Sequence, residues 1–173
     1  TTKLTLNENL KAENLNEAKV ILWGKSEISA PKIEFSNVKD GILALDKDSK
    51  LTSANGNANV EVSGANSSLK IGILGDKSFD INAQGGSKII LSSLPLQDSE
   101  AKNPSSKNVD SSPTANFSGK ITASGESSVE SLLDTITASV ILNKSDSNKN
   151  DNISGKPSLN AKNITLDSTH NEI

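Results

Sequence analysis

The chain contains no cysteine, methionine, tyrosine or arginine, and its only aromatic residues are one tryptophan and three phenylalanines. Without cysteine, neither a disulfide framework nor a thiolate metal site can form. Aromatic side chains stack on bases and sugar rings, so their scarcity argues against nucleic-acid binding and against a glycosidase groove. The net charge of −3 provides neither a basic field for nucleic acid nor a polybasic patch for a membrane surface.

Long apolar runs are also missing. No run approaches the roughly 20 residues that span a bilayer, and no signal peptide is present, so we expect no membrane insertion by this segment. The absence of an initiator methionine suggests a processed chain or an excised fragment. Hydrophobic residues make up 33% of the 173 residues, which is thin for one compact globule.

What the sequence does contain is a series of short aliphatic runs separated by Gly, Asn, Asp and Ser. Side chains alternate between the two faces of a strand, so these runs predict strands, and the polar residues between them predict turns. Short strands with turn residues at this spacing indicate an all-β fold. The predicted strands are 4–6, 19–23, 32–35, 42–45, 59–62, 69–74, 78–82, 88–91, 117–123, 135–143 and 163–166.

Three segments depart from this pattern. In residues 127–134, Ser127 and Glu130 match a capping box, which predicts a short helix. Residues 97–116 and 144–158 are polar and almost devoid of apolar side chains, so we expect a flexible loop insertion and a polar loop. The predicted organisation is therefore β-coils over 1–96, the loop 97–116, and further β-rich coils over 117–173.

A short phrase recurs along the chain: an aliphatic residue, one polar residue, then alanine. In a β-solenoid, each short strand points an aliphatic residue inward, and a small residue fits where the interior narrows toward a corner. Each coil then buries its inner face against its neighbours, so stability adds along the axis. The phrase predicts a right-handed parallel β-helix, or solenoid, with two loop insertions. Its copies begin at Leu10, Ile28, Ile81, Ile121, Ile136 and Leu159.

The alternative fold is an antiparallel β-sandwich, because its strand spacing overlaps with that of a solenoid. We expect Phe35, Phe79 and Phe117 to fill interior gaps where neighbouring coils are small. Trp23, at the end of an aliphatic run, is expected to cap or pack the core rather than to bind a ligand.

The segments Ile28-Ser29-Ala30, Gly85–Leu91 and Leu159–Leu166 resemble the passenger regions of bacterial surface β-helix proteins. These include autotransporter adhesins and filamentous-haemagglutinin-type exoproteins. The acidic, cysteine-free composition, rich in Ser, Thr and Asn, is also similar to that of surface-layer proteins. The resemblance implies a secreted protein at the bacterial cell surface or outer membrane, with an adhesive, virulence-related or structural role. It transfers no functional residue.

One segment partly matches a calcium loop. Asp146, Asn148, Asn150 and Asn152 place oxygen ligands at every second position, but the sixth position is Asp151 instead of Gly. The twelfth position is a proline instead of a bidentate Glu. Calcium is therefore the one cofactor that we consider, and a solvated polar loop is the alternative. The single histidine, His170, lies beside Asp167 and Ser168, an arrangement that is more typical of an exposed tail than of a catalytic triad.

The sequence thus predicts a non-enzymatic extracellular segment that presents loops from a rigid β-stack. We expect its partners to be a host surface protein or glycan, or neighbouring copies of the same protein. An antiparallel binding module and a surface-layer building block remain alternatives. A carbohydrate-active β-helix enzyme is a third, although the acidic residues are scattered among lysines.

Overall fold

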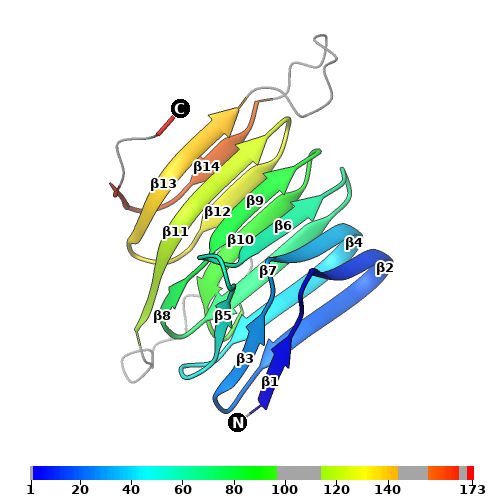
Figure 1. The fold of residues 1–173 in the computed structure, drawn as a ribbon. Helices are drawn as coiled ribbons and strands as arrows, with labels where there is room; N and C mark the ends of the chain where they lie inside the picture. Colours follow the sequence, from blue (N-terminus) through cyan, green and yellow to red (C-terminus); the bar gives the residue numbers. More distant parts are fainter. Residues whose placement is uncertain (1, 97–113, 144–155, 168–170) are drawn as a thin grey trace.

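The computed structural model describes residues 2–96, 114–143, 156–167 and 171–173. Over these ranges the chain is all β and contains no helix (Figure 1). The strands are β1 (Thr2–Thr5), β2 (Asn9–Leu22), β3 (Ser26–Ser29), β4 (Lys32–Leu45), β5 (Lys50–Thr52), β6 (Asn59–Ser63), β7 (Ser68–Ile73), β8 (Gly75–Ser78), β9 (Asp80–Gln84), β10 (Lys88–Ser93), β11 (Ala115–Ser124), β12 (Ser128–Ser131), β13 (Ile136–Asn143), β14 (Ser158–Asn160) and β15 (Ile164–Leu166).

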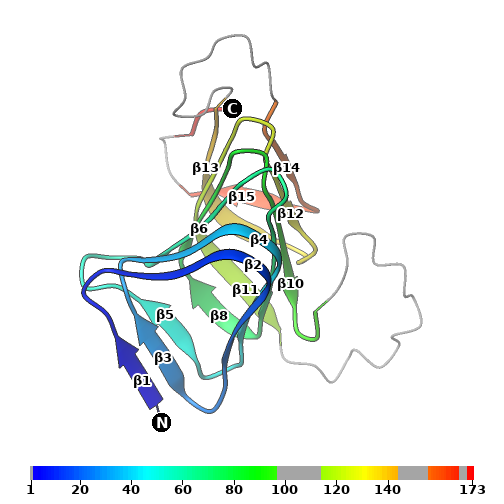
Figure 2. The same ribbon diagram turned by 90° about the vertical axis from the view of Figure 1, so that its right-hand side faces the viewer.

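The strands stack in parallel, and each one pairs with a strand of an adjacent coil. Figure 2 looks roughly along the stack and shows the strands lined up behind one another as a curled sheet. One wall consists of β14, β12, β10 and β7 with the second half of β4, and a second wall contains the first half of β4 with β6, β9, β11 and β13. A separate three-stranded sheet is formed by β1, β3 and β5.

Every pairing between these named strands is parallel, so the antiparallel sandwich is wrong for the described part of the chain. The physical reason is the connection between paired strands. An antiparallel pair can be joined by a tight hairpin, whereas here each strand finds its partner only after the chain has completed a turn of the stack. The strand spacing in the sequence therefore reflects successive walls, not successive hairpins.

Aliphatic side chains form continuous columns through the stack, and the recurring phrase marks two of them. The first position of the phrase forms one column and the alanine position forms the next, both inside the second wall. Their buried members are at most 1% exposed. The first column is Leu10, Ile33, Val60, Ile81, Ile121 and Val140, and the second is Ala12, Phe35, Val62, Ala83, Ala123 and Leu142.

The other copies of the phrase occupy other positions around the coil. Ile136 stacks on Phe117 and Ile164, whereas Leu159 stacks on Val129 in the wall that contains β12 and β14. The likeness between the segments that begin at Leu10 and at Leu159 is therefore not a stacking relation. The phrase occurs where a strand comes to a corner of the coil, whichever wall the strand belongs to. It does not mark one fixed position in the coil.

The three phenylalanines are interior residues, as predicted, and each is at most 3% exposed. Phe79 and Phe117 contact each other edge to face, with ring centroids 5.1 Å apart. Gly119 allows this packing, because a Cβ at that position would overlap the carbonyl oxygen of Phe79.

The predicted helix at 127–134 is wrong, because residues Ser128–Ser131 form β12. β12 has parallel neighbours on both sides, β10 and β14, and these ladders override the local capping signal. Ser127 is fully buried, and its Oγ accepts the backbone N–H groups of Gly86, at 2.9 Å, and Ser87, at 3.1 Å. The serine therefore satisfies donors of the preceding coil instead of those of its own first turn.

Two predicted strands, 32–35 and 42–45, are parts of the single strand β4. β4 and β2 bend around a corner at Asn37 and Asn14, whose φ angles of 54° and 56° place both in the left-handed region. Asparagine tolerates this conformation, so the ladder between the two strands resumes beyond the corner without a loop.

The predicted loops extend too far at their C-terminal ends. Ala115 and Asn116 begin β11, and Ser158 begins β14, because each pairs with a strand of the preceding coil. Residues 97–113 and 144–155 lie outside the described residues, as do the four proposed calcium ligands and His170.

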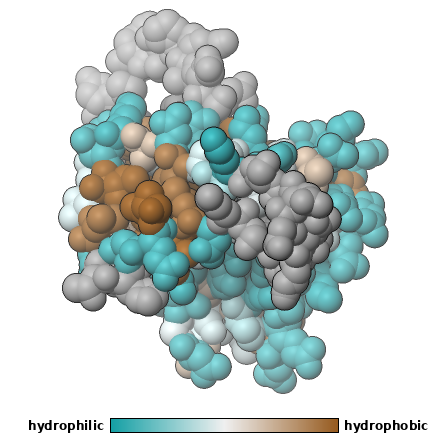
Figure 3. Space-filling model, turned by 90° about the horizontal axis from the view of Figure 1, so that it is seen from above, coloured by the Kyte–Doolittle hydropathy of each residue, from teal (hydrophilic) through white to brown (hydrophobic). Residues whose placement is uncertain are grey.

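Both ends of the stack expose aliphatic side chains. Leu4 and Leu15 are 43% and 46% exposed in the first coil, where no described strand covers them. Ile164, Leu166 and Ile173 are the exposed large hydrophobic residues near the other end. Figure 3 looks down on that end and shows hydrophobic surface gathered on one side of it.

The role of Ser127 yields a prediction. Ser127→Ala leaves two buried N–H groups without their acceptor, so we expect it to lower the free energy of unfolding by about 1–3 kcal/mol. Ser128→Ala is the matched control, since Ser128 is only half-buried, and it should have less effect. Urea denaturation measures both. An equal loss in the two variants would mean that the Ser127 hydroxyl does not stabilise this corner.

Candidate functional site

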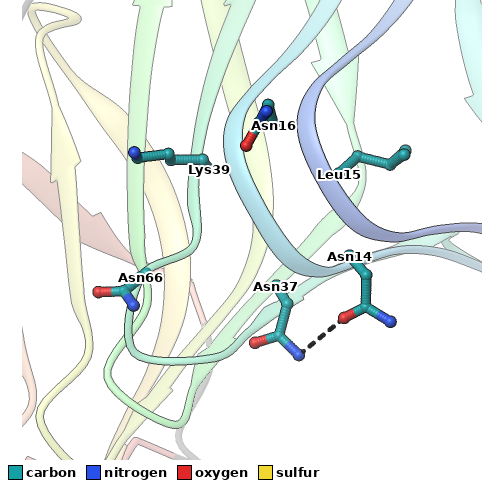
Figure 4. A pocket seen from close by; sticks show the side chains of 6 residues that line it. All are labelled: Asn14, Leu15, Asn16, Asn37, Lys39 and Asn66. Atoms are coloured by element: carbon teal, nitrogen blue, oxygen red, sulfur yellow. Dashed lines mark hydrogen bonds between the residues drawn. The ribbon is translucent and has the colours of Figure 1, made fainter.

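A polar depression lies at the corner where β2 and β4 bend. Its volume is 620 Å³, within the range of small-molecule sites. Figure 4 shows the side chains around it, which come from three successive coils. They are Asn14, Leu15, Asn16, Asn37, Lys39 and Asn66, and together they form what we call the corner pocket.

The amides of the corner pocket are partly ordered by one another. Asn37 donates from Nδ2 to Oδ1 of Asn14 at 3.2 Å (Figure 4). Below Asn37 the corner continues with Gly64, where a Cβ would overlap Asn37 Oδ1. The glycine therefore leaves room for the Asn37 carboxamide, and the two asparagine side chains stay stacked along the corner.

The other polar groups of the corner pocket are available to a ligand. No described residue forms a hydrogen bond or ion pair with the side chains of Asn16, Asn66 or Lys39, and all three are exposed. The Nδ2 donors of Asn14 likewise have no bonding partner within the described ranges. The pocket therefore offers amide groups and one ammonium group, and its six lining residues include no carboxylate.

A second, apolar groove of 570 Å³ lies on the outer face of the wall that contains β4 and β7. Trp23 lines it and is 58% exposed, so the expectation that Trp23 caps or packs the core is wrong. Trp23 follows β2, whose buried side chains end at Leu22, so strand alternation points Trp23 outward. Ile21 and Ile42 lie beside it in the groove.

The chain itself covers the rest of this outer face. Leu94, Pro95 and Leu96 line the groove opposite Trp23, and a Cβ at Gly72 would overlap the side chains of both leucines. Because Gly72 has no side chain, the segment Leu94–Leu96 can lie flat against the sheet. Ala44, beneath this segment, is only 4% exposed although it faces outward. The groove is the part of this apolar face that stays open.

Lys77 is a buried lysine that the sequence analysis missed. It is 5% exposed and occupies the interior position that Phe117 and Ile136 hold in the next coils. Burial lowers the pKa of its ammonium group, although Asp46, Asp48 and Asp76 favour the charged form. Its Nζ donates to the carbonyl oxygen of Lys47 at 3.1 Å. Strand alternation over the short β8 was the only signal that could have found it.

An ion pair on the second wall has a structural explanation. Lys32 Nζ lies 2.8 Å from Glu61 Oε1, and Gln84 donates to the other oxygen of the same carboxylate. The hydrogen bond to Glu61 raises the pKa of Lys32 against the opposing effect of burial. Both oxygens of the buried Glu61 are thus satisfied, and the pair joins β4, β6 and β9.

The turn Asp46–Asp48 also binds its own backbone. Burial alone would raise the pKa of the Asp46 carboxyl, but hydrogen bonds from the backbone N–H groups of Gly24, at 2.7 Å, and Asp48, at 3.2 Å, hold it below its usual value. Across the residues that the structure describes, no group of three or more His, Asp or Glu side chains is placed to hold a metal ion. No helix in those ranges could span a membrane.

Comparisons add no relative. The chain matches no family model, no curated protein and no solved structure. Its function must therefore be inferred from its own surfaces and packing.

Trp23 provides a test of the open groove. Because it is the only tryptophan, all indole fluorescence reports on this site. We expect the emission of a water-exposed indole and efficient quenching by acrylamide, close to that of free N-acetyltryptophanamide. Emission shifted to the blue, together with weak quenching, would mean that the groove is closed in solution.

Lys77 provides a pH-dependence prediction. Its folded-state pKa is lowered, so as pH rises toward the unfolded value of about 10.4 the folded state releases this proton first and gains stability. Lys77→Met removes that contribution and keeps an unbranched side chain. We expect the variant to be at least as stable as the wild type at pH 7.

The readout is the stability difference between the two proteins, measured by urea denaturation from pH 7 to pH 11. The advantage of the methionine variant should shrink as pH rises. Comparing the two proteins cancels the opposite contribution of Lys32, whose raised pKa loses stability at high pH. An advantage that grows with pH would contradict the assignment.

Proposed function

We propose that this chain is a non-enzymatic, extracellular structural or adhesive segment of a bacterial surface protein. In this proposal the stack is a right-handed parallel β-helix, with the residues of 97–116 and 144–158 that lie outside the strands inserted as two loops. The observation that best supports this proposal is the set of aliphatic columns that pass through successive coils, such as the one from Leu10 to Val140.

Columns of this kind suit a stalk, because each coil adds its own buried area and its own ladder. A rod assembled in this way gains stability with length and needs neither disulfides nor a single central nucleus. Its outer walls are then free to vary, since their side chains do not hold the fold. Here those walls are largely polar, and their depressions include the corner pocket and the apolar groove lined by Trp23.

The partner in this proposal is a host surface protein or glycan. Exposed pockets on a rigid scaffold favour binding, because little conformational entropy is lost when the ligand is held. Calcium at Asp146, Asn148, Asn150 and Asn152 remains a separate proposal, which melting with and without a chelator would test.

A surface-layer building block is the second candidate. The exposed Leu4, Leu15, Ile164 and Leu166 at the two ends of the stack favour it, because apolar ends promote association with neighbouring copies. This reading differs from the first in its partner, which would be another copy of the chain.

An adhesion assay tests the lead proposal. Beads that carry the folded chain should bind cultured host cells saturably, and free chain should compete. The control is the same bead loaded with heat-unfolded chain, which has the same composition and charge. Binding no better than this control would remove the adhesive reading. Concentration-dependent assembly in light scattering without cell binding would favour the surface-layer reading instead.

A further inference from the structure

We propose that the corner pocket binds an acidic saccharide, with its amides on the sugar oxygens and Lys39 on the acidic group. This inference rests on the proposed adhesive function and names the ligand class and the site. It depends on the juxtaposition of four asparagines and one lysine from three coils around one depression of 620 Å³ (Figure 4).

The first step is the chemistry of the amides. A carboxamide both donates and accepts hydrogen bonds, and a sugar hydroxyl does the same, so asparagines can satisfy hydroxyls of either orientation. Asn14, Asn37 and Asn66 come from successive coils, and neighbouring strands lie roughly 4.8 Å apart. Asn14 and Asn37 are therefore stacked at the bend, and Asn66 of the third coil lines the same pocket two residues beyond Gly64, which takes the bend there; this spread of amides suits a ligand with several oxygens better than a single small ion.

The second step is charge. Lys39 supplies the only charged group among the lining residues, and no described residue pairs with its ammonium. The adjacent depression contrasts with this, because its lining residues include two acids, Glu17 and Asp40, and two lysines, Lys19 and Lys70, so its formal charges balance. The corner pocket is thus the place on this corner where an anionic substituent meets an unpaired cation.

The third step is the lack of an apolar platform. Leu15 lines the pocket, but it stacks on the buried Val38, and Figure 4 shows its side chain pointing away from that of Lys39. No aromatic residue lines the pocket, and recognition must therefore depend on hydrogen bonds and charge. That dependence predicts modest affinity and a strong preference for acidic over neutral sugars.

The experiment uses two matched probes. Sialyllactose carries a carboxylate and lactose does not, and calorimetric titration of the full chain compares them at low ionic strength. We expect sialyllactose to bind at least about ten-fold more tightly than lactose, which corresponds to roughly 1.4 kcal/mol. Added salt should weaken the acidic ligand more than the neutral one.

Variants then locate the site. Asn14→Gly combined with Asn37→Gly removes two carboxamides but keeps residues that accept the left-handed φ angles, so the fold should be retained. We expect this double variant to weaken sialyllactose binding about ten-fold. Lys39→Gln should remove the preference over lactose. Lys162→Gln is the matched control, because Lys162 is exposed and lies far along the chain, next to Asp134.

Each outcome decides. Equal binding of the two sugars, or no binding of either by a folded wild-type chain, overturns the acidic-saccharide site. Sialyllactose binding that is unchanged in both pocket variants overturns it as well, whatever the effect of Lys162→Gln. If the pocket variants lose sialyllactose binding but beads coated with these variants still bind cells, the saccharide site is confirmed and cell adhesion does not depend on it. If wild-type beads bind no cells while the sugar still binds, the adhesive function fails and the site remains.

Discussion

The parallel register between coils is the constraint on which the rest of the structure depends. Because each strand pairs with the equivalent strand of the next coil, an inward residue always stacks on an inward residue, as Ile33 stacks on Val60 and Val60 on Ile81. A slip of one residue would turn every such column outward. The alternation of aliphatic and polar residues therefore fixes the fold more firmly than any single contact.

The parallel register does not by itself bend the chain at the corners. At these corners, polar side chains are buried in the interior. Two of the corner serines are buried against strands of earlier coils. Ser67 Oγ accepts the N–H of Val38 at 3.1 Å, and Ser87 Oγ donates to the carbonyl of Val62 at 2.9 Å. These hydroxyls bond backbone groups of the preceding coil, so buried polar groups at the corners remain satisfied. The same requirement explains why Ser127 is interior and does not begin a helix.

Sequence alone predicted the all-β class, most strand positions and the buried phenylalanines, because these follow from alternation, a local property. It failed where a residue's role is set by a different coil. Trp23 ends an aliphatic run, yet it lines a groove whose other residues, such as Ile42 and Leu94, belong to later coils. Lys77 is interior because β8 pairs with β11 forty residues on, beyond a long polar stretch. The corner pocket was missed for the same reason, since its asparagines are scattered in the sequence.

The corner also shows how a surface can acquire binding chemistry without cost to the stack. The left-handed bend accepts either glycine or asparagine, and the later coils use Gly85 and Gly125, with φ angles of 69° and 66°. The first two coils use asparagine at equivalent bends, where the carboxamide is not needed to hold φ. Their side chains, with Lys39 beside them, add hydrogen-bonding groups to a position that the fold would leave bare. A structural requirement for φ > 0 thus leaves the choice of side chain open to function.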